Sequence, residues 1–366
     1  MGKNINQLTP ALAIHPGEII LDEINANGFT QVDFAKMIGM EKSQLNEIIK
    51  GKRDVNAEVA TLLGAALGIE ANYWLNLQNQ YNLDKVKIDE KTVVRVESIE
   101  IYQEISSWVA QKYLRKQNVL CGDPIKDLPL ISEIYGVNDP RQLSTVFDNA
   151  QFARFRKSET LQVDKVNLVG WVKYSEYLAK NVEVESFSPD CWSDLKDELR
   201  ALIHRNQNVH QEAQDILSNY GIKLIYQDKA EKAPIDGIAF WSNSKPSIAL
   251  TLRHKRLDNF AFTLFHELGH VFLHLVNDES KEVIDLVNNE EQFKQSSEEI
   301  EANNFASNNL IPEIEWEKFM SNFTITEDIV YEFADKIGMN PSIILGRICY
   351  EMGRYNIKTN ISHRIH

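Results

Sequence analysis

Residues 262–274 read Phe262-Thr263-Leu264-Phe265-His266-Glu267-Leu268-Gly269-His270-Val271-Phe272-Leu273-His274. They lie in a run, 258–277, whose apolar residues fall nearly all round a helix, which predicts a buried helix that begins at the cap Asp258. Because His266 and His270 are four residues apart, both imidazoles lie on one helix face and can bind one ion. Glu267 lies about 100° around the helix, where its carboxylate reaches a water on that ion without being a ligand.

The two histidines could instead be core side chains that are bonded to backbone carbonyls. Burying two histidines and a glutamate in a phenylalanine-rich helix is costly, however, unless these side chains are paired or bind a metal. The HExxH spacing therefore favours a metal site. A catalytic zinc ion keeps one position for water, so it needs a third protein ligand.

The third ligand is predicted in a later helix, within the stretch Ser296-Ser297-Glu298-Glu299-Ile300-Glu301-Ala302-Asn303-Asn304-Phe305-Ala306. Glu299 shares a helix face with a stripe of small and apolar residues, which lets this helix lie close against the first one. Glu298 and Glu301 point elsewhere. We therefore predict Glu299 as the third ligand; the alternative is a capping box with Ser296.

Two further residues are predicted near the ligands. Asn303 follows Glu299 by one turn, where it can hydrogen-bond a ligand histidine. His274 continues the row eight residues after His266 and so lies about 12 Å along the axis, too far to bind the same ion. We expect His274 to support the ligands from outside or to lie on the surface near the helix end, where the helix dipole favours its cation.

These residues predict a zinc-dependent peptidase. Zinc held by His266, His270 and Glu299 lowers the pKa of water toward about 7, and Glu267 takes the proton as water attacks a peptide carbonyl and then delivers it to the leaving amine. Three short runs before the helix, 222–226, 237–241 and 247–252, predict strands. The last run is predicted as an edge strand on which an extended substrate pairs.

The N-terminal residues predict a helix-turn-helix unit. Thr30 and Asp33 form a capping pattern before a helix that Gly39 ends. A second helix, 41–50, buries apolar residues on one side and ends at Gly51. Two short helices with a glycine turn between them are typical of DNA-reading units.

Composition limits the function classes. The chain has 366 residues, which predicts two or three domains, and no apolar run approaches the roughly 18 residues that span a bilayer. The first residues do not form a secretory signal, and three cysteines far apart fit free thiols, so we expect a cytoplasmic protein with no membrane partner whose metal ligands are not cysteines. A formal charge of 39 − 53 = −14 argues against non-specific coating of nucleic acid, although a local DNA reader is compatible with it.

The periodicity predicts an α+β chain in four segments. Residues 1–82 form an all-α helix-turn-helix domain, and 83–205 a helical connector. Residues 206–320 form a domain with a small sheet, and 321–366 a helical tail.

Residues 262–274, followed by 299–306 and 310–312, resemble the ImmA/IrrE family of zinc-dependent metallopeptidases over about 206–320. The resemblance implies a zincin-like fold, with His266, His270 and Glu299 at the ligand positions and Glu267 at the general base. Some members cleave transcriptional repressors of phages, mobile elements or stress responses. Residues 337–347 resemble the helical tail of such fusions.

Residues 15–20, the helix-turn-helix and 66–78 resemble the HigA branch of XRE-like DNA-binding proteins over 10–82. Members are commonly antitoxins that dimerise and repress their own operon. The match places Gln31, Lys42, Ser43, Gln44 and Asn46 at the DNA. Four of the six cations in residues 1–80 lie between 42 and 53, including Lys50, Lys52 and Arg53, so the basic footprint is centred on the second helix.

Together these features predict a transcriptional regulator that binds operator DNA, as a homodimer, and cleaves a regulatory protein or itself through its zinc domain. The alternative is an antitoxin-like repressor, paired with a cognate toxin, whose zinc domain is a sensor or scaffold without proteolysis. An intact Glu267 favours the first function, because a structural metal site needs no general base.

Overall fold

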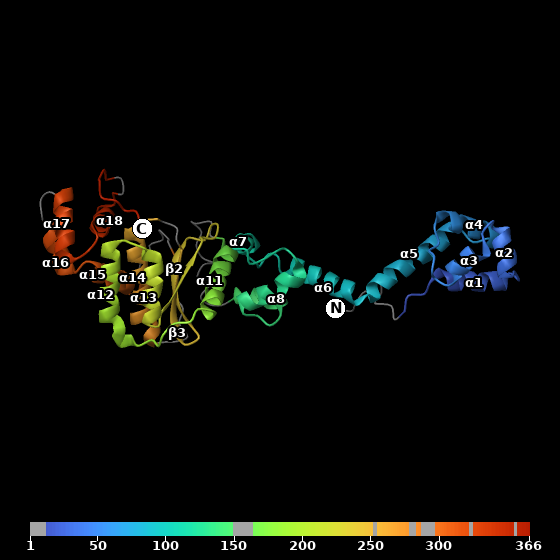
Figure 1. The fold of residues 1–366 in the computed structure, drawn as a ribbon, viewed down its shortest axis with the longest axis horizontal. Helices are drawn as coiled ribbons and strands as arrows, with labels where there is room; N and C mark the ends of the chain where they lie inside the picture. Colours follow the sequence, from blue (N-terminus) through green and yellow to red (C-terminus); the bar gives the residue numbers. More distant parts are fainter. Residues whose placement is uncertain are drawn as a thin grey trace. The chain divides into compact units, whose positions relative to one another are not determined.

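The computed structural model describes residues 12–148, 164–251, 255–277, 283–286, 297–321, 325–354 and 357–366. The chain divides into two compact units, Met1–Gln103 and Glu104–His366. The α+β layout predicted from the sequence is confirmed, whereas the boundaries predicted at 82, 205 and 320 stay predictions. Figure 1 shows the helical first unit and the mixed second unit.

The described part of the first unit contains helices and no strand. Its helices are α1 (Pro16–Ala26), α2 (Gln31–Met37), α3 (Lys42–Ile49), α4 (Ala57–Leu67), α5 (Ala71–Ile88) and α6 (Glu90–Glu104), the last ending one residue inside the second unit. Phe34, Leu45, Ile48 and Trp74 are almost fully buried and form the centre of its core.

The predicted helix-turn-helix is confirmed in α2 and α3. The Thr30 side chain accepts a hydrogen bond from the Asp33 amide at 3.2 Å, as a capping residue should. Gly39 and Gly51 both have a φ of +67°, a conformation that favours glycine and ends each helix. Gly17 of α1 lies so close to the Ile48 carbonyl that a side chain there would collide with it, which fixes α1 against the end of α3.

The second unit combines a small sheet with many helices. Its described helices are α7 (Gln111–Lys116), α8 (Pro124–Tyr135), α9 (Leu143–Val146), α11 (Lys165–Lys180), α12 (Trp192–Arg205), α13 (Val209–Asn219), α14 (Leu257–Leu273), α15 (Ser297–Leu310), α16 (Glu313–Met320), α17 (Glu327–Ile337) and α18 (Pro341–Met352). Its strands are β1 (Lys223–Gln227), β2 (Ile235–Ser242), β3 (Lys245–Thr251) and β4 (Val283–Leu286).

The strands are hydrogen-bonded in the order β1-β3-β2-β4. β1 runs parallel to β3, while β2 is antiparallel to both β3 and β4. Ile248 of β3 pairs with Leu224 on one side and Ala239 on the other. The prediction that β3 is an edge strand is therefore wrong, because both of its hydrogen-bonding sides are taken; the edges of the described sheet are β1 and β4.

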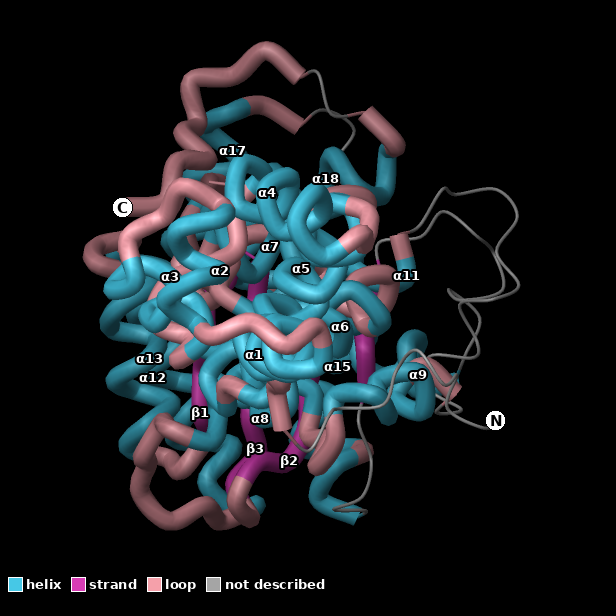
Figure 2. The backbone as a smooth tube through the Cα atoms, turned by 90° about the vertical axis from the view of Figure 1, so that its right-hand side faces the viewer, coloured by secondary structure: helices cyan, strands magenta, loops and turns pink. Residues whose placement is uncertain are grey.

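Helices cover both faces of the sheet. Figure 1 shows α11 on one side of the strands and α12, α13 and α14 on the other, and Figure 2 shows β1, β3 and β2 side by side. Leu264, Phe265 and Leu268 of α14 are completely buried in the core on that second side. This packing fixes α14, the helix that carries the HExxH motif, directly against β2 and β3.

No helix among the described ranges is long and apolar enough to cross a membrane.

Candidate metal centre and nucleic-acid interface

The HExxH motif lies on α14, which runs from Leu257 to Leu273 and is followed by a short 3-10 helix, Leu275–Asn277. The predicted cap was wrong by two residues: Arg256 is the extended N-cap, and Asp258 lies in the first turn. Asp258 instead accepts two hydrogen bonds from the Arg256 guanidinium, at 3.0 and 2.6 Å. The ion pair between Arg256 and Asp258 therefore stabilises the first turn of α14, which has no side-chain cap.

Helix α15 approaches α14 closely because small residues line the contact. Gly269 of α14 faces Ala302, and an added Cβ on Gly269 would lie 3.1 Å from the Ala302 Cα. Ala302 and Ala306 are completely buried. This close approach brings the Glu299 carboxylate of α15 within reach of the two histidines of α14.

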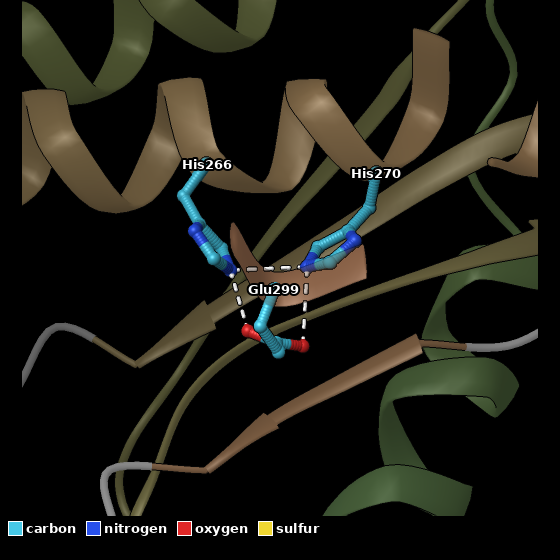
Figure 3. A group of neighbouring side chains, drawn as sticks. All are labelled: His266, His270 and Glu299. Carbon is cyan, nitrogen blue, oxygen red and sulfur yellow. Dashed lines mark hydrogen bonds and ion pairs between the residues drawn. The ribbon is translucent and has the colours of Figure 1, made fainter. Parts of the chain in front are cut away.

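Figure 3 shows His266 and His270 projecting from one helix toward Glu299. The two Nε2 atoms are 3.0 Å apart. His266 Nε2 lies 3.3 Å from Glu299 Oε2, and His270 Nε2 lies 3.5 Å from Glu299 Oε1. Among the described residues these three form the group of side chains whose ligand atoms converge closely enough to hold a metal ion.

The outer nitrogens of both histidines are held by hydrogen bonds. His266 Nδ1 donates to Asn303 Oδ1 at 3.1 Å, as the position of Asn303 predicted. His270 Nδ1 lies 3.0 Å from His274 Nδ1, and His274 Nε2 lies 3.1 Å from Glu301 Oε2. Since the Glu301 carboxylate only accepts, His274 Nε2 carries the proton, and His270 Nδ1 then donates to His274 Nδ1.

This hydrogen-bond pattern fits a metal ion. In the neutral rings that a metal binds, it leaves the Nε2 atoms of His266 and His270 without protons, so two nitrogen lone pairs and a carboxylate are turned toward one another. Both histidines are buried, where such a set of acceptors is unfavourable without a cation. Tetrahedral zinc with bonds of 2.0–2.1 Å places its ligand atoms about 3.3 Å apart, close to the separations seen here.

Glu267, the neighbour of His266 on α14, is completely buried. Its carboxylate lies against Gly237 of β2, and a side chain at that position would collide with it. Gly237 therefore lets β2 pass close enough to hold the carboxylate beside the sheet.

The structure brings together five of the six residues that we predicted around the metal: His266, His270, Glu299, Asn303 and His274. The sixth, Glu267, is buried against Gly237, and its reach to a metal-bound water stays a prediction. His274 is buried and touches His270, so of our two expectations the structure shows the supporting position. Ser296, the alternative capping partner of Glu299, lies outside the described residues.

Two contacts of the site were not anticipated. Glu301 had been expected to point away from the ligands, yet it bonds to His274. Gly237 had no assigned role. The sequence did carry a signal for the contact between Glu301 and His274: His274 continues the row of histidines, and Glu301 follows Glu299 by two residues. The contact between Gly237 and Glu267 depends on tertiary packing alone.

The predicted DNA contacts lie along α2, α3 and the following turn. Side chains that are exposed are Lys42, Ser43, Lys50, Lys52 and Arg53. Gln31, Gln44 and Asn46 are half-buried. Leu45 and Ile48 face the core of the unit, so α3 turns its polar side outward as predicted.

Comparisons with known proteins agree with this division. A model described as a helix-turn-helix matches residues 20–74, and one described as the IrrE N-terminal-like domain of peptidase family M78 matches residues 217–348. Virulence-associated protein I of Dichelobacter nodosus is 34% identical over 82 residues, which are 22% of this chain and 76% of that protein.

Two further proteins are similar to this chain. The HTH-type transcriptional regulator YddM of Escherichia coli K12 is 31% identical over 78 residues, covering 21% of this chain and 80% of its own length. A solved structure from Nostoc punctiforme, described as an antidote protein of a plasmid maintenance system, is 37% identical with a TM-score of 0.19 and covers 19% of this chain and 77% of its own. The chain thus belongs to the DNA-binding transcriptional regulators of the helix-turn-helix class and carries an IrrE N-terminal-like domain of the M78 peptidase family.

Proposed function

We propose that this regulator is a zinc-dependent peptidase that cleaves a regulatory protein, and that cleavage is linked to repression of the operator it binds. The convergence of His266, His270 and Glu299 in a buried site carries this proposal. Glu267, next to the first ligand, supports catalysis over a structural role, because a structural metal site needs no additional carboxylate.

The chain's own residues supply the steps of peptide hydrolysis. His266, His270 and Glu299 would hold zinc, which polarises a peptide carbonyl and makes water a better nucleophile. Glu267 takes a proton from water as its oxygen attacks the carbonyl carbon. When the C–N bond breaks, Glu267 returns that proton to the leaving amine. Asn303 and His274 hold the ligand rings in place through this cycle.

The DNA-binding unit supplies the second activity. We infer that α3 enters the major groove, where Gln44 and Asn46 contact base edges and Lys50 and Lys52 contact phosphates. A homodimer would place two copies of α3 on a palindromic operator. Its protein partner would be a repressor or a cognate toxin. A protein that acts on operator DNA belongs in the cytoplasm, where we place it.

The metal dependence of cleavage tests the peptidase. Purified full-length protein should hold about one zinc ion per chain and cleave a partner repressor, a neighbouring toxin or itself near residues 83–91. A chelator should stop cleavage, and added zinc should restore it. Glu299→Ala should lose both zinc and cleavage, whereas Glu298→Ala, its neighbour on α15, should keep both.

Other results would contradict the proposal. Full zinc content in Glu299→Ala would show that Glu299 is not a ligand. Cleavage that survives the chelator would show that another activity is responsible. A zinc-loaded protein that cleaves none of these candidates would favour a repressor whose zinc domain is a sensor or scaffold.

A further inference from the structure

Beside the metal centre lies a second feature, a cavity of about 430 Å³ within the second unit. Its walls come from the N-terminal half of α14, the C-terminal end of α15 and one face of α18. Its size falls in the range of binding pockets in proteins. None of the predicted metal ligands lines it, so it is a separate space.

The cavity lies along the same pair of helices, α14 and α15, as the candidate metal ligands. His270 of α14 faces Glu299 of α15 and His266 faces Asn303, so residue numbers fall on α15 as they rise on α14, and the two helices are antiparallel. These pairs are four residues apart on each helix, so the next pair one turn further along is Phe262 of α14 and Ser307 of α15. Both residues line the cavity.

Phe262 lies directly between the two sites. Its ring is stacked on the His266 ring with 6.3 Å between centroids, and the same side chain lines the cavity. At 1.5 Å per residue along α14, Phe262 and Asn259 lie about 6 and 10 Å from the level of His266. An extended peptide advances about 3.4 Å per residue, so two or three residues span this distance.

The charges in the cavity wall are neutralised by one another. Arg256 is paired with Asp258, and Arg347 is paired with Glu313 at 2.6 Å and Glu351 at 2.9 Å. An incoming charge would therefore find no free counter-charge and would lose its water.

The remaining wall is apolar with two neutral polar groups. The apolar surface comes from Phe262, Leu310, Ile311, Ile343 and Tyr350. Asn259 and Ser307 also line the cavity, and within the described ranges neither side chain has a hydrogen-bond partner. This wall suits an uncharged side chain, aliphatic or aromatic, and the backbone that carries it.

We propose that this cavity selects the substrate: it takes an aliphatic or aromatic side chain that lies two or three residues from the peptide bond at the metal. This inference rests on the proposed peptidase function. It assigns α18, at the C-terminal end of the IrrE-like domain, a part in substrate choice.

A binding experiment tests the chemistry of the cavity without catalysis. The probes are the N-acetyl amides of leucine, phenylalanine and aspartate, and the protein is the full chain observed by saturation-transfer NMR. Leucine and phenylalanine amides should bind in the millimolar range and compete with each other, and the aspartate amide should not bind. Equal binding of all three would overturn the proposal.

Two variants locate this binding. Ser307→Phe fills the cavity and should abolish binding, whereas Asn308→Phe adds the same ring at the exposed neighbouring position and should leave binding unchanged. Tyr350→Ala removes an exposed part of the wall, which the fold tolerates, and should weaken binding several-fold. Unchanged binding in both Ser307→Phe and Tyr350→Ala would place the probes elsewhere and overturn the proposal.

Cleavage profiles separate this inference from the proposed function. With a peptide library, the wild type should prefer an apolar residue two or three positions from the cut by about 10- to 100-fold in kcat/KM, and Ser307→Phe should lose this preference. Cleavage without such a preference overturns the inference and leaves the peptidase intact. Amides that bind to a protein that cleaves no peptide overturn the peptidase, and the cavity is then a small-molecule site.

Discussion

Asn303 and Glu301 hold the two candidate histidine ligands through different chemistry. His266 donates to the neutral amide of Asn303, whereas His270 is linked through His274 to the carboxylate of Glu301. A carboxylate at the end of such a chain makes the ligand nitrogen a stronger donor to a metal. We therefore expect His270 to contribute more than His266 to metal affinity.

The first prediction concerns Glu301. Glu301→Ala should lower zinc affinity by about 10- to 100-fold, because His274 loses its acceptor and no longer orients His270. Glu301→Gln keeps a hydrogen-bond acceptor without the charge, so its zinc affinity should lie between those of the wild type and Glu301→Ala. The affinity is measured by competition with a coloured chelator.

Matched variants show whether the effect passes through His274. Glu298→Gln on the same helix should bind zinc as the wild type does. Adding Glu301→Ala to His274→Asn should cause little further loss, because the chain is already broken. Wild-type affinity in Glu301→Ala would remove Glu301 from the account.

At the level of residues, local geometry made the convergence of the three candidate ligands predictable. His266 and His270 follow from helix spacing, and the small stripe around Ala302 singled out Glu299 and Asn303. The contact of Glu301 was not predictable in this way. It depends on the end of α14, where His274 is the C-cap and leaves the regular helix.

Among the elements, α14 depends on a charged first turn. Burial raises the pKa of Asp258, but hydrogen bonds from His363 and Arg256 outweigh this effect, and the pKa lies below its ordinary value. Because the pKa is lowered in the folded state, Asp258 stabilises the fold above the ordinary aspartate pKa. This contribution is lost as the pH falls through the lowered pKa.

We predict that Asp258→Asn lowers the free energy of unfolding at pH 7 by about 2 kcal/mol. The difference from the wild type should shrink when both are measured in urea at pH values below the ordinary aspartate range. Asp335→Asn, at an exposed position, should change little at either pH. A difference that stays constant down to the lowest pH would mean that the charge of Asp258 is not responsible.

We proposed that α3 reads the DNA, and its two kinds of side chain should then behave differently. Gln44→Ala and Asn46→Ala should relax base preference, with losses of about 1–3 kcal/mol on the selected sequence. Lys50→Ala and Lys52→Ala should weaken binding to all sequences. Each should also reduce, by about 1, the slope of the logarithm of the binding constant against the logarithm of the salt concentration.

Duplexes selected from a random pool and scrambled duplexes are compared by fluorescence anisotropy. Lys85→Ala, on the exposed side of α5, is the control and should bind both as the wild type does. Selected-sequence binding that is unaffected by all four α3 variants would place the DNA on another surface.

Elements were easier to predict than their pairing. Short apolar runs separated by turn residues predicted the three strands before α14, and β1, β2 and β3 lie where they were expected. The neighbours of β3 could not be predicted. β1 pairs with β3 in parallel, although β2 lies between these two strands in the sequence. Such a pairing depends on how α11, α13 and α14 cover the two faces, which no local pattern encodes.

For the whole molecule, domains of two distinct families share one chain. Residues 20–74 and 217–348 match separate family models, and both were recognisable from short motifs. The cavity beside the candidate metal site could not be recognised from the sequence, because its walls come from α14, α15 and α18, which meet only in the folded unit. The central claim is that the metal site is catalytic, so that this regulator acts by proteolysis as well as by binding DNA.

Comparing the wild type with Glu267→Gln tests that claim most directly. Both proteins should carry the same zinc content, since Glu267 is not a ligand, and both should bind the operator. The variant should cleave the partner repressor, toxin or its own chain about 10² to 10⁴ times more slowly, because the general base is gone. Equal rates of cleavage in the two zinc-loaded proteins would contradict the account.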